Sequence, residues 1–190
     1  MLRNPPLTIH KPLANIKTNT SMSKNYSSKD LETNYDIELE HILLEIKNQR
    51  GNHMRHFIDQ YFCYKNEYVT NNCKPVWDKI NWNEYVSEEA ANNPDTNITR
   101  DHVVPLKVLT EMLLNLGAKA TKKQIQDILD EFLCFATITK MEDQKLNAAG
   151  LKSKMPDDCY KNGKLPNNEK FARYQKTEIS INHAVKNINL

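Results

Sequence analysis

The sequence predicts an α+β fold in which a helical N-terminal part packs beside a small core of two strands and one helix. Apolar residues recur at helical spacing through residues 36–62. Two short segments, 98–104 and 135–138, carry the β-branched and aromatic residues typical of strands. A segment with both a helix start signal and a helix stop signal follows the second strand. The length of 190 residues fits a single domain.

Residues 1–29 are predicted to form a flexible basic arm. They hold five Lys and Arg residues and no acidic residue, and they sustain no apolar period. Residues 30–98 hold six basic and thirteen acidic residues, and residues 99–138 hold five of each. Residues 139–190 hold ten basic and six acidic residues. The arm and the C-terminal third are therefore basic enough to neutralise phosphates, although an ordinary mixed-charge surface explains the same numbers.

Residues 30–97 are predicted to form a helical and loop-rich N-terminal part. One helix is indicated from Asp36 and a second from about Met54. Residues 63–98 contain both tryptophans amid Asn and Pro, which predicts loops with a short helix near 87–91. We expect these aromatic side chains to belong to a small core more often than to platforms for nucleotide bases.

Residues 98–180 are predicted to form the core, with a helical insert of about thirty residues between its two strands. Thr121 is the expected N-cap of the second helix in that insert. Thr139 is the expected N-cap of the last helix, with Glu142 at the third position to complete a capping box and Gly150 at its end.

Residues 181–190 are predicted to be a tail. No apolar run is long enough to span a bilayer, and the first residues lack the apolar stretch of a secretory signal. We therefore expect a cytoplasmic protein without a membrane partner. The four cysteines form no C-x-x-C pair, so we expect free, packed thiols rather than a zinc knuckle.

The residues that indicate chemistry are Asp101 and His102, at the end of the first predicted strand. Asp143 and Asn147 lie four residues apart, so they share one face of the last predicted helix. Carboxylate and amide oxygens suit a hard cation, and an imidazole titrates near neutral pH. Phosphodiester hydrolysis uses such a set, with a base to activate water and a cation to stabilise the leaving oxyanion.

The segment Asp101-His102-Val103-Val104-Pro105 resembles the D-H-x-x-P strand motif of the HNH, or ββα-metal, endonucleases of the phage and restriction type. Residues 136–147 are similar to the second strand and metal-bearing helix of that family. Residues 150–156 and the Arg173-Tyr174 pair resemble C-terminal features of its members. The resemblance covers about residues 98–178. The insert is longer than a simple hairpin, and the paired cysteines of many members are absent.

The resemblance implies a metal-dependent endonuclease that hydrolyses phosphodiester bonds in DNA. His102 would be the catalytic base that activates water, and Asp101 a ligand of the divalent cation. Asp143 and Asn147 would complete the metal site from the helix. Mg²⁺ or Mn²⁺ suits these oxygen ligands better than Zn²⁺.

The same resemblance implies contacts with the DNA backbone. Arg173 would be catalytic and would hold the scissile phosphate, and Lys152 and Lys154 would contact neighbouring phosphates. Glu142 or Gln144 is an alternative helix ligand, because Asp143 stands where the family often has His or Asn.

Double-stranded DNA is the expected partner, and a homodimer would suit cleavage at symmetric sites. One alternative is a nuclease toxin of a bacterial competition system, whose partner would be an immunity protein. A restriction enzyme would instead accompany a methyltransferase. A nucleic-acid-binding protein of the same fold without catalysis is the alternative from another class, and the choice between DNA and RNA stays open.

Overall fold

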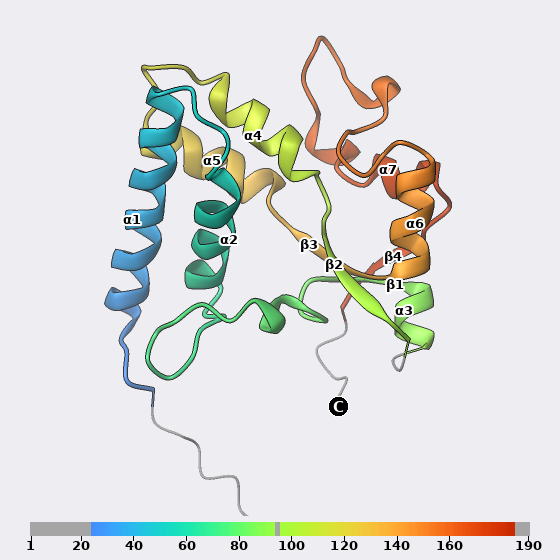
Figure 1. Ribbon diagram of the computed structural model, residues 1–190, viewed down its shortest axis with the longest axis horizontal. Coiled ribbons are helices and arrows are strands. Elements are labelled where there is room, and N and C mark those ends of the chain that lie inside the picture. Colours follow the sequence, from blue (N-terminus) through green and yellow to red (C-terminus); the bar gives the residue numbers. More distant parts are fainter. Residues whose placement is uncertain (1–23, 94–95, 185–190) are drawn as a thin grey trace, which may run out of the picture.

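The computed structural model describes residues 24–93 and 96–184 (Figure 1). Its helices are α1 (Ser28–Lys47), α2 (Met54–Lys65), α3 (Glu88–Asn92), α4 (Leu106–Leu114), α5 (Lys122–Phe132), α6 (Lys140–Ala148) and α7 (Ala172–Lys176). Three short 3-10 helices complete the helical elements: η1 (Trp77–Ile80), η2 (Asp157–Cys159) and η3 (Asn167–Glu169). The fold is α+β, as the sequence predicts.

The strands form one mixed sheet in the order β2-β3-β1-β4. They are β1 (Tyr85–Ser87), β2 (Ile98–His102), β3 (Phe135–Thr139) and β4 (Ile181–His183). β2 and β4 are antiparallel to their neighbours, whereas β1 lies parallel to β3 in the centre. The sheet therefore combines strands from both predicted parts of the chain.

The sheet separates two hydrophobic clusters. The larger cluster takes residues from α1, α2, α4 and α5, and it includes Phe135 of β3. The smaller cluster lies on the opposite face and includes Ala136, Ile138, Leu146 and Tyr174. Figure 1 shows the same division, with α1, α2, α4 and α5 on one side of the sheet and α3, α6 and α7 on the other. Because neighbouring residues of a strand point to opposite faces, β3 contributes to both clusters.

Capping boxes fix the start of three helices. Thr121 accepts a hydrogen bond from the Gln124 backbone at the start of α5, and Thr139 accepts one from the Glu142 backbone at the start of α6. Both predicted N-caps are therefore confirmed. Gly150 follows the C-cap of α6 with a φ of 68°, the left-handed conformation that favours glycine.

Two predicted boundaries are wrong. α1 begins at Ser28, inside the predicted arm, because Ser27 and Asp30 form a capping box there. The predicted tail includes β4, which pairs with β1 through three residues. Residues 1–23 of the arm and 185–190 of the tail lie outside the described residues.

The order β2, β3, α6 follows the predicted core of two strands and a helix. Between these two strands lie α4 and α5, the predicted helical insert. The sheet extends beyond the two strands, however, since β1 and β4 continue it on the β3 side. The sheet by itself therefore does not define a two-stranded metal core, and the HNH assignment remains a proposal.

Candidate functional site

The strand β2 places Asp101 and His102 on opposite faces of the sheet. Successive side chains of a strand alternate between faces, so two neighbouring residues cannot point to one site while the strand stays regular. His102 pairs in register with Phe135, and Asp101 pairs with Ala136. The two residues therefore meet different surroundings, with the larger cluster beside His102 and the smaller one beside Asp101.

On the first face, His102 forms a hydrogen-bonded pair with Asp59 of α2. The distance from His102 Nε2 to Asp59 Oδ1 is 2.9 Å, and the side chains are 11% and 5% exposed. The imidazole also stacks on Phe135, with 4.4 Å between ring centres. An ionised carboxylate only accepts hydrogen bonds, so in this contact Nε2 of the imidazole is the donor.

The other carboxylate oxygen of Asp59 faces Arg55, one turn earlier on α2. The distance from Arg55 Nε to Asp59 Oδ2 is 3.6 Å, and the Arg55 side chain is 70% exposed. Residues four apart on a helix lie one above the other, so α2 positions both members of this pair. Asp59 thus joins a buried histidine to an exposed cation.

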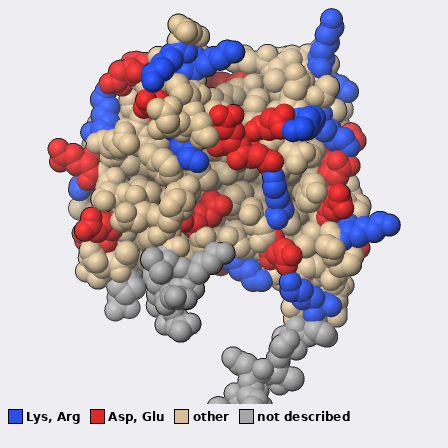
Figure 2. Space-filling view, turned by 180° about the vertical axis from the view of Figure 1, so that it is seen from behind, with Lys and Arg blue, Asp and Glu red and all other residues tan. Residues whose placement is uncertain are grey.

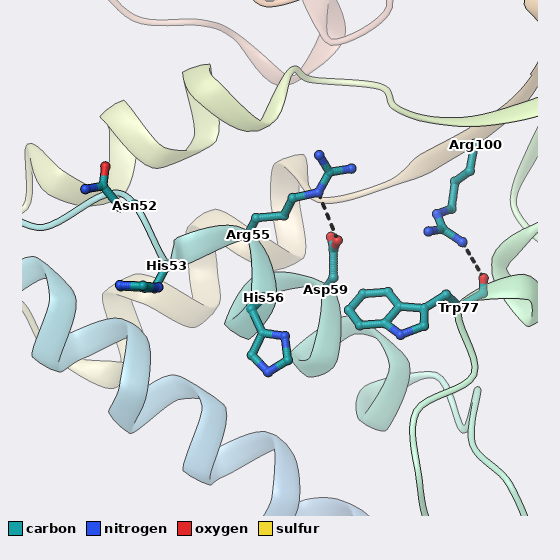
Figure 3. A pocket seen from close by; sticks show the side chains of 7 residues that line it. All are labelled: Asn52, His53, Arg55, His56, Asp59, Trp77 and Arg100. Carbon is teal, nitrogen blue, oxygen red and sulfur yellow. Dashed lines mark hydrogen bonds and ion pairs between the residues drawn. The ribbon is translucent and has the colours of Figure 1, made fainter.

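Asp59 lies at a hollow of about 370 Å³ (Figure 3). The residues that line it are Asn52, His53, Arg55, His56, Asp59, Trp77 and Arg100. In Figure 3 the Asp59 carboxylate lies between the side chains of Arg55 and Arg100. The hollow is open, and it is formed by α2 and the loop before it, η1 and β2.

Arginines outnumber acidic residues in the lining of this hollow. Arg100 donates a hydrogen bond of 2.6 Å to the Trp77 carbonyl, and its guanidinium lies 5.9 Å from the centre of the Trp77 ring. Two arginines stand against one acid, Asp59, which is itself hydrogen-bonded, and two histidines also line the hollow. Guanidinium groups bind the oxygens of phosphate and carboxylate with charge-assisted hydrogen bonds. The hollow therefore suits an anionic ligand.

On the second face, Asp101 belongs to a buried network around Arg173. Arg173 is 0% exposed and forms an ion pair with Asp101, whose side chain is 16% exposed. The guanidinium also donates to the carbonyls of Val103 (2.9 Å), Leu151 (3.3 Å) and His102. Arg173 therefore joins the end of β2 to the loop that follows α6.

Tyr174 completes this network by donating a hydrogen bond of 2.5 Å to Asp101. Burial, and the neighbouring Asp101 carboxylate, raise the pKa of the Tyr174 hydroxyl well above its ordinary value. The hydroxyl therefore remains a hydrogen-bond donor. This placement does not fit the predicted contact of Arg173 with a phosphate, because its donors are used inside the protein and none of its surface is exposed.

Two of the three predicted metal ligands are ion-paired within the protein. Asp101 is held by Arg173, and the Asp143 carboxylate forms an ion pair of 2.8 Å with Lys152. Asn147 is exposed on α6. Over residues 24–93 and 96–184, no group of three or more His, Cys, Asp and Glu residues is placed to hold a metal ion. These residues, in this arrangement, do not fit the metal site that the resemblance implies.

The alternative helix ligands are no better placed. The Glu142 carboxylate accepts hydrogen bonds from the Ser87 hydroxyl at 2.6 Å and from the Thr139 backbone at 2.8 Å, and it is buried. Gln144 is exposed on α6. Glu142 therefore acts as the second half of a capping box and ties α6 to β1.

Lys152 and Lys154 are both exposed. Lys152 is paired with Asp143, so part of its charge is already compensated. Figure 2 shows acidic and basic side chains mixed on one face of the protein rather than gathered by sign. The net charge of +2 is likewise small. A predicted contact of these two lysines with DNA is compatible with their exposure and remains a prediction.

Sequence reasoning missed Asp59, Arg55 and Arg100. Their only signal in the sequence is the Arg-x-x-x-Asp spacing on an expected helix, which is common on exposed helix faces. The pairing of Asp59 with His102 spans 43 positions of the chain. The sequence around Asp59 does not indicate that it pairs with His102, because the pairing is a tertiary contact that only the fold defines.

Comparison of the chain with protein-family models, with curated proteins and with solved structures finds no match. In the part of the chain that the structure describes, the search for membrane-spanning helices finds none with the required length and apolar character.

Proposed function

We propose that the protein is a phosphodiester hydrolase, an endonuclease acting on DNA, in which His102 is the general base. The observation that carries the proposal is the 2.9 Å hydrogen bond between His102 and Asp59 at the edge of a cationic hollow. A carboxylate that holds one imidazole nitrogen leaves the other free to accept a proton. The sequence resemblance at Asp101-His102 supports the same reaction.

In this proposal Asp59 orients His102 and stabilises the imidazolium that forms. His102 Nε2 donates to Asp59, so Nδ1 is the atom that takes a proton from the attacking water. The proposal requires water to reach Nδ1, and 11% of the His102 side chain is exposed. Of the dyad, Asp59 lines the hollow and His102 lies behind it, so a ligand there would meet Asp59 first.

Arg55 and Arg100 would bind and polarise the phosphate. Negative charge increases on the phosphoryl oxygens during attack, and a fixed guanidinium stabilises that charge more than a mobile solvent dipole does. Arg100 is held by the Trp77 carbonyl, whereas most of the Arg55 side chain is exposed. Arg100 is therefore the more rigid of the two cations.

The involvement of Mg²⁺ or Mn²⁺ stays a prediction from the resemblance. Asp101 and Asp143 are each paired with a cation of the protein, so we derive no catalytic step through a metal ion. A divalent ion could still arrive with the phosphate substrate, as it does in many phosphoryl-transfer enzymes. Chelation tests this point directly.

The test is incubation of the purified protein with supercoiled plasmid and with single-stranded DNA, each with Mg²⁺ and with EDTA. We expect nicking or cleavage by the wild type, and a loss of rate of about 10²–10⁴-fold in His102→Ala, because a missing general base costs about that factor. The matched control is His183→Ala, which removes an exposed histidine of β4 that does not line the hollow.

Wild-type activity in His102→Ala would remove His102 from the mechanism. Absence of cleavage under every condition, with RNA included as a substrate, would contradict the proposed function. The same result with retained DNA binding would favour the nucleic-acid-binding alternative.

A further inference from the structure

We propose that the hollow binds one unpaired nucleotide, with its base stacked on Trp77 and its phosphate on Arg55. This inference rests on the proposed function and names the substrate class of that site. It goes beyond the resemblance, which concerns β2 and α6 and makes no use of Trp77. The argument depends on the position of Trp77, the size of the hollow and the direction of Arg55.

Trp77 begins η1, which the loop after α2 places against the hollow. Its side chain is half-buried and packs against the larger hydrophobic cluster. The Arg100 hydrogen bond to its carbonyl and the Arg100 guanidinium over its ring, 5.9 Å from the ring centre, hold this segment in place. An indole held in this way is a suitable platform for a base, because every base has an aromatic face.

The hollow, at about 370 Å³, is at the lower end of the range for small-molecule pockets, about 300–1,000 Å³. A single nucleotide suits such a volume. Bases of a duplex stay stacked inside it, so a base can enter a pocket only from a single strand or after flipping out. The substrate class is therefore an unpaired nucleotide within a nucleic-acid strand.

Arg55 supplies the phosphate contact. Its Nε faces Asp59 at 3.6 Å, and Figure 3 shows its two terminal nitrogens directed away from that carboxylate. Two terminal nitrogens of one guanidinium can donate together to two phosphate oxygens. The phosphate on Arg55 would then lie on the far side of the guanidinium from Asp59, so that Arg55 stands between the phosphate and the dyad that the proposed reaction uses.

Tryptophan fluorescence tests the stacking without relying on catalysis. The chain has two tryptophans, so Trp82→Phe, which changes the one that does not line the hollow, isolates the Trp77 signal. In that background we would titrate a short oligothymidylate, the same strand with an abasic site at each position in turn, and a blunt duplex. Binding is measured with EDTA present, which prevents metal-dependent cleavage.

We expect the single strand to quench Trp77, the duplex to quench it far less, and at least one abasic strand to bind more weakly. Trp77→Ala should weaken binding of the single strand about 5- to 150-fold, which is the usual contribution of one stacked base. Trp77→Phe should keep affinity within a few-fold, because it keeps an aromatic face. Urea unfolding of both variants checks that they fold.

Equal affinity of wild type, Trp77→Phe and Trp77→Ala for the single strand would overturn this inference. So would duplex binding that quenches Trp77 as strongly as the single strand does. If either of these binding results is found but cleavage depends on His102, the proposed function survives and only the nucleotide assignment fails. If Trp77 is quenched as expected but no substrate is cleaved, the nucleotide assignment survives and the proposed function fails.

Discussion

The two faces of β2 give neighbouring ionisable residues opposite roles. Asp101 faces a buried network in which Arg173 is 0% exposed and donates to backbone carbonyls as well as to Asp101. His102 faces Asp59 and, beyond it, a hollow lined by cations. The two side chains are similarly enclosed, with 16% of Asp101 and 11% of His102 exposed, so the difference lies in what their partners face: a buried arginine on one side and an open hollow on the other. A D-H pair in a regular strand is therefore better treated as two sites than as one.

The largest effect should come from Arg173→Met, which keeps much of the side-chain volume and removes the charge. Asp101 would then be left in the network without its cation, and breaking one partner of a buried ion pair costs about 3–5 kcal/mol. Urea unfolding at pH 7 measures the free energy of unfolding. The control is Arg55→Met, because the Arg55 side chain is 70% exposed and its 3.6 Å pair with Asp59 should contribute less than about 1 kcal/mol.

Similar losses in the two arginine variants would break the comparison between the faces. A loss in Arg173→Met that matches the control would mean that the network contributes little to stability. A larger loss of unfolding free energy in Arg55→Met would mean that the fold depends on charge at the hollow rather than in the buried network around Arg173.

The next effect concerns Glu84, which lies just before β1 and accepts a hydrogen bond of 2.8 Å from the Phe135 backbone. Burial raises the pKa of this carboxyl to about 7, although the Phe135 hydrogen bond and Lys170 oppose the shift. The folded state therefore holds the proton more tightly than the unfolded state. Ionisation destabilises the fold progressively as the pH rises from about 4.5 to 7.

Glu84→Gln removes this penalty and keeps a side-chain oxygen for the Phe135 backbone. We expect the variant to be more stable than wild type by about 1–3 kcal/mol at pH 8, since one pKa unit corresponds to about 1.4 kcal/mol and residual exposure reduces the total. At pH 4.5 the two proteins should differ little. Urea unfolding at both pH values gives the difference, and a difference that does not vary with pH would contradict the assignment.

A smaller change in stability is expected for Asp59→Asn. The amide oxygen can still accept the hydrogen bond from His102, so the free energy of unfolding should fall by about 1 kcal/mol or less. The rate of DNA cleavage should nevertheless fall at least about 10-fold, because a neutral amide does not stabilise the imidazolium. A cleavage assay beside urea unfolding separates the two effects.

Asp101→Asn is the matched comparison for that variant. It changes the other face of β2, so it should affect stability more than the catalytic rate measured on folded protein. The opposite ranking, with Asp101 setting the rate and Asp59 setting the stability, would restore the ligand role that the resemblance assigns to Asp101.

The smallest effect is expected for the exposed lysines. If they contact phosphates, Lys154→Ala should reduce the slope of log affinity against log salt by about 1, through lost counterion release. Lys152→Ala should change it less, because Asp143 already compensates that charge. Fluorescence anisotropy at several salt concentrations measures both slopes. Slopes equal to wild type in both variants would place the DNA on another surface.

Local signals predict much of the helical structure. Thr121 and Thr139 define helix starts because a capping box needs only residues three apart. The three-residue strands β1 and β4 could not be predicted in the same way. Their pairing depends on partners far along the chain, and three residues are too few to display an alternating pattern.

The candidate site is less predictable, and for a similar reason. The strand period places Asp101 and His102 on opposite faces, and this could have been inferred from the sequence. What surrounds each face could not, because Asp59 and Arg173 lie 43 and 72 positions from their partners. The resemblance implies a phosphate contact for Arg173, and arginine is mostly exposed in proteins. Its complete burial depends on the tertiary packing.

The sheet order also has a consequence for folding during synthesis. Residues are added from the N-terminus, so β1 and β2 emerge before β3, and β4 emerges after all three. Until β4 pairs with it, β1 presents an unpaired strand edge of the kind to which other chains can add. The central parallel pair, β1 with β3, also brings together residues about fifty positions apart, a contact type that forms slowly. A chaperone that protects exposed strand edges would therefore act mainly before β4 has paired.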